Sequence, residues 1–348
     1  MYPRAALASV LLTACLGPQA EITPERAERQ LDWMADAIPL CAAGTSAGTT
    51  RRSVSEMLEL LRIVQAVETR KVARKDGTFD YPGACGGGMR YDYDHGGGVT
   101  TYALHFEDYC AHSEGGTPNL LRGGMRGKEI GQSTPDGPMI SAFELDADLG
   151  MRFDVAPAEL AQRTPWGGSG DGGTGGGGAL PQAEGDVRLI LQGLRSDYGN
   201  PSTWNPDPPT ASAPDRTRVR RIRLEQDGNA DALEIRDLVF ESVGADNPET
   251  HIREGKLVGA DGSWVSLSTP EDGPIQVDMG GGVMVGGTIR MEGTGDTTAE
   301  LVVDLMARNF ELSVNGEVAD RGLDCAAAVP LMADIGAVVL SVMPELGR

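Results

Sequence analysis

The sequence predicts a mainly β protein built on a large antiparallel sheet, either a single curved sheet or a sandwich. Three observations lead to this fold class. Glycine and proline occupy 48 and 21 of the 348 positions, so the chain must turn often. Apolar residues make up 40% of the chain, which is enough for a core. From residue 77 onward, apolar residues recur at every second position, as in strands with one buried face.

The chain begins with a segment that is typical of an export signal. Arg4 is followed by the almost wholly apolar run 5–14, which is shorter than the roughly 20 residues of a membrane-spanning helix. The sequence LTAC, which ends at Cys15, resembles the lipobox of bacterial lipoproteins. This resemblance implies a signal peptide over 1–14 and acylation of Cys15 as the mature N-terminus. An ordinary secretory signal, cleaved nearer Ala20, is the alternative.

In such lipoproteins the residue after the cysteine helps to select the membrane. Leu16 is not the aspartate associated with retention at the inner membrane, so the resemblance implies the outer membrane, with the domain facing the periplasm or the cell surface. Acyl chains bury many methylene groups at about 0.8 kcal/mol each, which suffices to hold a soluble domain. The first expected partner is therefore the membrane, through the N-terminal lipid.

Two amphipathic helices are expected in an anchor and helical segment over 15–74. Thr23 and Pro24 fit an N-cap and a first helical position, and apolar residues then follow at helical spacing, which predicts a helix over 24–39. The sequence SVSE forms a capping box at the start of a second helix over 54–68.

Residues 75–320 are expected to form the antiparallel β domain, with at least ten strands and two of them between 140 and 155. Hairpin-type dipeptides and GGG runs mark its turns and bulges: 227–228, 261–262, 315–316, 86–88, 96–98 and 280–282. A Gly-rich stretch over 166–182 and a Pro-rich stretch over 200–217 predict a flexible and an exposed loop. The C-terminal segment 321–348 is expected to be helical in part, with Asp324 as an N-cap.

The repeated theme of Gly-rich turn, alternating strand and Asp or Asn turn covers about 75–155 and 250–316. It resembles the β-rich lipoproteins of Gram-negative bacteria. This second resemblance implies no catalytic residue.

Four cysteines remain after Cys15, and an even number in an exported chain indicates disulfides. Cys85 and Cys110 flank a Gly-rich stretch in which two strands would bring the ends together, so we predict that they pair. Cys41 and Cys325 are then left to tie the N-terminal helical region to the C-terminal one.

A metal site is the competing hypothesis for this stretch, because His95, His105 and His112 lie in or beside it. No C-x-x-C occurs, and the spacing matches no common zinc pattern. Asp227-Gly-Asn-Ala-Asp231 matches the first half of a calcium loop but lacks the required glycine and glutamate, so we interpret it as a hairpin turn. No metal or cofactor is therefore predicted.

The formal net charge is −21, which disfavours nucleic acid and anionic headgroups as partners. One basic strip interrupts this acidity. On a regular strand, Arg216, Arg218 and Arg220 would share one face, and Arg221 and Arg223 the other. A solvated face paired with nearby acids is the ordinary interpretation of this strip, and docking of an anionic partner is the alternative.

The sequence contains no G-x-S-x-G, no H-E-x-x-H and no phosphate-binding G-x-x-x-x-G-K-[ST]. We therefore predict no catalytic residues and a non-enzymatic, lipid-anchored exported protein with a structural or partner-binding role. Two alternatives remain: a carrier that holds an apolar ligand between sheet and helices, and an envelope hydrolase with paired carboxylates.

Overall fold

The structure is a computed structural model. It describes residues 17–27, 76–112, 118–134, 137–152, 155, 187–197, 214–226, 234–243, 249–278, 283–304 and 309–321. Strands make up 76% of these residues, which confirms the mainly β class. In this part of the chain, no helix has the length and apolar character that crossing a bilayer requires.

Fifteen strands and one short 3-10 helix are found among the described residues. They are β1 (Gly77–Pro82), β2 (Gly88–Gly96), β3 (Val99–His112), β4 (Pro118–Thr134), β5 (Gly137–Arg152), β6 (Val187–Asp197), β7 (Asp215–Gln226), β8 (Glu234–Val243), β9 (Glu249–Val258), β10 (Trp264–Ser268), β11 (Ile275–Asp278), β12 (Val283–Glu292), η1 (Thr294–Asp296), β13 (Thr298–Asp304), β14 (Asn309–Val314) and β15 (Glu317–Arg321).

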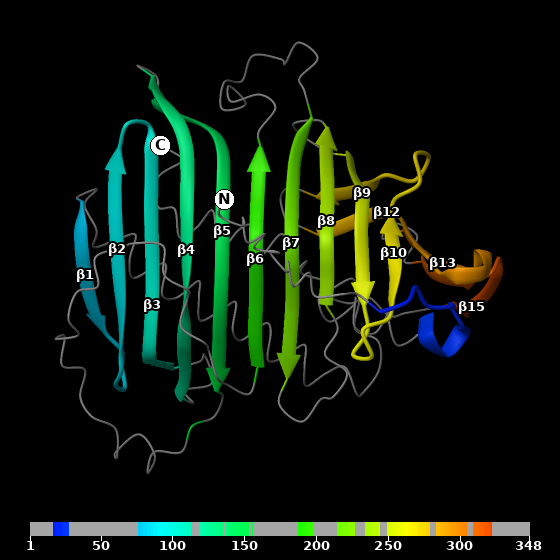
Figure 1. The fold of residues 1–348 in the computed structure, drawn as a ribbon, viewed down its shortest axis with the longest axis horizontal. Helices are drawn as coiled ribbons and strands as arrows, with labels where there is room; N and C mark the ends of the chain where they lie inside the picture. Colours follow the sequence, from blue (N-terminus) through cyan, green and yellow to red (C-terminus); the bar gives the residue numbers. More distant parts are fainter. Residues whose placement is uncertain are drawn as a thin grey trace, which may run out of the picture.

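All fifteen strands belong to one antiparallel sheet, in which almost every strand pairs with its neighbours in the chain. The spatial order is β1 to β10 in sequence, then β12, β13, β14 and β15, while β11 pairs with β9 and β12. Figure 1 shows β1 to β9 side by side as a broad surface, with the later strands turned away beyond β10. Most strands therefore pair with the strand before and the strand after them in the chain, and antiparallel pairing of this kind needs no crossover connection.

One face of the sheet forms a continuous apolar core. Alternate residues along the strands are buried on this face, with exposed fractions of 3% or less at central positions such as Leu104, Leu145, Leu191, Ile235 and Leu301. The residues between them carry the charges of the opposite face, which we call the outer face. The two-residue period of the sequence is thus the period of burial.

Bulges interrupt this alternation at several strands. The register shifts at Asp108 of β3, opposite Asp146 in the pairing of β5 with β6, and around Asp237 of β8. Asp108, Gly193 and Asp237 have φ values of 49°, 63° and 51°. Asp tolerates this left-handed region better than most residues, so these positions absorb the extra residue and bend the strands.

Two of the predicted turns are found between paired strands, while those at 227–228 and 280–282 lie outside the described residues. Gly97 and Gly98, with φ of 62° and 78°, connect β2 to β3. Asn315 and Gly316, with φ of 51° and 80°, connect β14 to β15. Two consecutive positive φ values are what a two-residue turn between right-twisted strands requires.

The predicted disulfide between Cys85 and Cys110 is present. It joins the turn before β2 to β3, with the two Cα atoms 5.1 Å apart. Cys110 is fully buried and packs with Leu120 and Val155 in a small second cluster. The β2–β3 hairpin brings the two cysteines together because the strands pair in register from Gly88 to Gly96.

The N-terminal segment 17–27 is hydrogen-bonded to the sheet beside β10. The backbone N–H of Gly17 donates to the carbonyl of Gly262 at 2.8 Å, and that of Ala20 donates to the carbonyl of Trp264 at 2.8 Å. Gln19 forms a parallel bridge with Trp264. The described helical turn at 24–27 begins as predicted, because the N–H of Arg26 donates to Thr23 Oγ1 at 3.3 Å.

Several other predictions fall outside the described residues. They concern the rest of the helix 24–39, the helix 54–68, the loop 166–182, the turn at 227–231 and the C-terminal segment from 322 on. The predicted end of the Pro-rich loop at residue 217 is wrong, because β7 begins at Asp215. The prediction of two strands between 140 and 155 is wrong, since the single strand β5 continues unbroken from Gly137 to Arg152.

The long strand β4 was missed by the sequence pattern, and Gly127 explains why. Gly127 lies opposite Tyr102 of β3, whose ring occupies the space where a Cβ of residue 127 would stand. The ring of Tyr102 therefore fills the core position where an apolar side chain of residue 127 would be expected. For this reason apolar and polar residues do not alternate along β4.

We expect Gly127→Ala to lower the free energy of unfolding by about 1–3 kcal/mol, because the new methyl group must displace the buried Tyr102 ring. Gly96→Ala is the matched control, since nothing lies within 4 Å of its Cβ position. Urea unfolding followed by circular dichroism measures both variants. Equal stability of the two would contradict the proposed packing of Tyr102.

Candidate functional site

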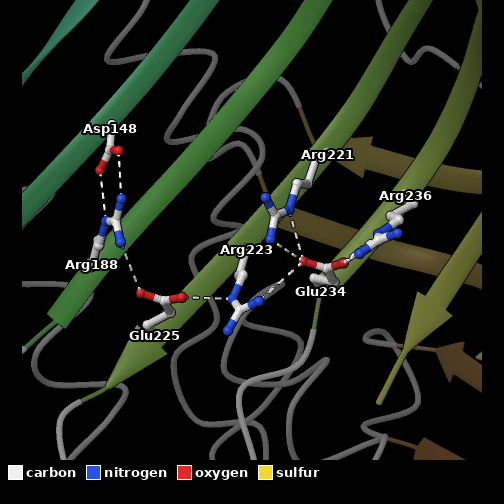
Figure 2. Close-up of polar contacts among 7 residues, drawn as sticks. All are labelled: Asp148, Arg188, Arg221, Arg223, Glu225, Glu234 and Arg236. Carbon is white, nitrogen blue, oxygen red and sulfur yellow. Dashed lines mark hydrogen bonds and ion pairs between the residues drawn. The ribbon is translucent and has the colours of Figure 1, made fainter. Parts of the chain in front are cut away.

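A chain of alternating charges crosses the outer face from β5 to β8. Figure 2 shows its seven members, which we call the arginine–carboxylate network: Asp148, Arg188, Arg221, Arg223, Glu225, Glu234 and Arg236. They come from four neighbouring strands and lie in adjacent cross-strand rows. Ion pairs connect all seven side chains into one group.

Glu234 is the centre of one half of the network, and its side chain is only 5% exposed. Arg221 Nε donates to Glu234 Oε2 at 2.8 Å, and Arg236 donates to Oε1. Arg223 Nη1 lies 3.7 Å from Oε2. Three guanidinium groups therefore surround one buried carboxylate, and these charge-assisted hydrogen bonds offset the cost of removing it from water.

Arg188 is the centre of the other half. Its Nε and Nη2 donate to the two oxygens of Asp148 at 2.8 and 2.7 Å, a bidentate pairing, and its Nη1 donates to Glu225 at 3.3 Å. The hydrogen bonds to Asp148 raise the pKa of Arg188 above its usual value. Arg223 Nε lies 2.8 Å from the other oxygen of Glu225, which joins the two halves.

The expected division of the basic strip between two faces is wrong. Val219 and Ile222 are both buried in the same core, although they are three residues apart. The alternation of β7 is therefore interrupted at Arg220 and Arg221. As a result, Arg221 and Arg223 lie on the outer face with Arg216 and Arg218, and the strip is a single cationic band.

Most of this band is paired with acids, as the ordinary interpretation predicts. Arg218 and Arg220 differ, because they are exposed and make no ion pair with any described residue. Arg218 also lies directly opposite Arg195 of β6. The arrangement offers no activated nucleophile, but it does hold guanidinium N–H groups ready for a carboxylate or phosphate on another molecule.

The histidines proposed for a metal site do not converge. His95 Nδ1 lies 2.8 Å from Thr100 Oγ1 at the β2–β3 hairpin, and His105 lies opposite Arg90 and Gly124. The side chain of His112 is not described. Within the described ranges, no three His, Cys, Asp or Glu side chains form a group that could hold a metal ion. Cys15, Cys41 and Cys325 lie outside those ranges.

Glu129 is a titratable group that sequence reasoning missed. It lies on β4 between Thr100 of β3 and Phe143 of β5, on the same face as the buried Phe143. Burial raises the pKa of Glu129 to about 7. Glu129 lies on the core face two residues after Gly127. The sequence alone does not reveal this, because it requires the register of β4 against its neighbouring strands.

No family model matches the chain, and no curated protein or solved structure shows a significant similarity to it.

We expect Glu234→Gln to lower the free energy of unfolding by about 3–5 kcal/mol, because three guanidinium groups lose their buried counter-charge. Glu300→Gln is the control: Glu300 pairs with Arg290 but is 34% exposed, so its loss should cost less than about 1 kcal/mol. Denaturant titration measures both. A loss at Glu234 no larger than that at Glu300 would refute the central role of this carboxylate.

We also expect Glu129→Gln to remove part of the pH dependence of stability. The pKa of Glu129 is about 7 in the folded chain against 4.5 normally, so wild-type stability falls as pH rises between these values and the carboxyl ionises in an apolar site. The variant should therefore gain stability relative to wild type above pH 7 and match it below pH 4.5. Urea midpoints across this range measure the effect, and the exposed Glu254→Gln should follow wild type throughout.

Proposed function

We propose that this chain is an exported protein, acylated at Cys15 and held at the outer membrane, whose sheet serves as a non-enzymatic structural or partner-binding platform. The observation that carries the proposal is the LTAC sequence that ends an apolar leader at Cys15. Cleavage before Cys15 would leave a mature chain whose third residue, Gly17, is already hydrogen-bonded to the sheet. The segment that is hydrogen-bonded to the sheet therefore begins two residues after the proposed mature N-terminus.

The disulfide between Cys85 and Cys110 supports the export step. Such bonds persist in oxidising compartments and are rare in a reducing cytosol. Cys110 is fully buried and its sulfur is bonded to that of Cys85, which is consistent with a structural role for the bond. A chain that relies on it is suited to the periplasm or the cell surface.

The outer face supports the platform role. The arginine–carboxylate network holds its long side chains in hydrogen bonds and ion pairs from β5 to β8, so the face presents them in a defined arrangement. The exposed Arg218 and Arg220 add a cationic feature to a chain of net charge −21. A protein partner that carries carboxylates is the best match for this surface.

We further propose that amphipathic helices over 24–39 and 54–68, together with a helix after Asp324, pack against the apolar face of the sheet. Their helical spacing of apolar residues supports this arrangement. A second disulfide between Cys41 and Cys325 would tie these segments together.

Labelled palmitate distinguishes the anchored protein from an ordinary secreted one. We expect wild type expressed with its leader in a Gram-negative host to incorporate the label and to sediment with membranes. Cys15→Ala should lose both properties, because it removes the only thiol at the proposed acylation site. Leu16→Ser, which keeps that thiol, is the matched control and should retain the label. Equal labelling of wild type and Cys15→Ala would remove the anchor hypothesis.

A further inference from the structure

The docked N-terminal segment fixes where the chain leaves the sheet. The backbone N–H of Gly17 donates to the carbonyl of Gly262, and the β-bridge between Gln19 and Trp264 is parallel. The segment therefore runs alongside β10 in the same direction, and Gly17 lies at the end where β10 begins. The described chain therefore begins beside the turn between β9 and β10, residues 259–263.

The distance from this turn to the proposed acyl group is short. Cys15 and Gly17 are two residues apart, and two residues span at most about 7 Å. The polar headgroup layer of each leaflet is about 5–8 Å thick. An acyl chain inserted from Cys15 would therefore hold Gly17 and its hydrogen-bonded partner Gly262 within or against the headgroups.

We propose that the turn 259–263 lies against the lipid headgroups, so that the sheet stands on the membrane at this end with no flexible linker. This inference rests on the proposed acylation of Cys15. It makes the contact with the bilayer a defined surface of the fold rather than a loose tether.

The side chains around the turn suit this position. Trp264 donates from its indole Nε1 to the carbonyl of Gly17 at 3.1 Å, and Lys256 Nζ lies 5.5 Å from the centre of the Trp264 ring. Arg26 donates to Ser263 beside them. Tryptophan, lysine and arginine are the residues that favour the membrane–water interface.

The arginine–carboxylate network lies at this end of the sheet. Val258, the last residue of β9, pairs with Glu234, which pairs with Arg223. The arginine–carboxylate network thus occupies the same end of the strands as the turn. Its four arginines oppose three carboxylates, so the network itself carries one net positive charge in a chain whose formal charge is −21, and it attracts anionic headgroups.

Photo-crosslinking tests the contact. The full chain is expressed with its leader, and p-benzoylphenylalanine replaces Ala260, an exposed residue of the turn, or Asp94, an exposed residue of β2. The purified protein is placed in vesicles of phosphatidylethanolamine and phosphatidylglycerol and irradiated. Mass spectrometry measures both the acyl mass on Cys15 and the fraction of chain bonded to phospholipid.

We expect the probe at position 260 to bond phospholipid at least several-fold more than the probe at position 94. A flexible insertion of about ten Gly and Ser residues between Leu16 and Gly17 adds a reach of roughly 17 Å. It keeps every contact of Gly17, and it should reduce the signal at position 260 several-fold.

The outcomes separate the two proposals. An unmodified Cys15 overturns both the proposed function and this inference. An acylated Cys15 with equal signals at positions 260 and 94 overturns the inference alone. An acylated chain in which the insertion leaves the signal at 260 unchanged does the same, because the short tether would then have no effect.

Discussion

Each strand of this sheet must keep one row of alternate side chains in the apolar core while the other row carries charge. A slip of one residue would exchange the two rows over the whole strand. The molecule meets this constraint with local bulges, at Asp108 and Gly193 and around Asp237, after which the alternation resumes in the opposite phase. The core stays continuous because the strands accept these extra residues.

The charged row creates a second requirement. A broad sheet brings many ionised side chains close together, so each charge needs an opposite charge near it. Arginine supplies most of the cations, with only four lysines in the chain. Its planar fork can bind two oxygens at once, as Arg188 does with Asp148. The same geometry lets three arginines share Glu234, and these ion pairs offset the cost of burying its carboxylate.

The N-terminal segment connects this architecture to the proposed location. Gly17 and Ala20 extend the hydrogen bonding of β10, and Ala20 and Ile22 join the apolar core. An anchor at Cys15 would therefore attach the membrane directly to the sheet and not through an independent tail. Such a platform would present its outer face at a fixed height above the bilayer, which suits a structural or partner-binding role.

The amino-acid sequence by itself determined the mainly β class, most strands, the hairpin turns at 97–98 and 315–316 and the Cys85–Cys110 pair, because each depends on neighbours close in the chain. Only the tertiary structure decided the rest. It revealed β4, whose pattern is hidden because Tyr102 of another strand fills the place above Gly127. It also placed Arg221 and Arg223 on one face with Arg216, and it partly buried Glu129. Arg221, Arg223 and Arg236 meet around Glu234 only in the folded chain. Those features depend on register across strands, which periodicity along a single strand does not contain.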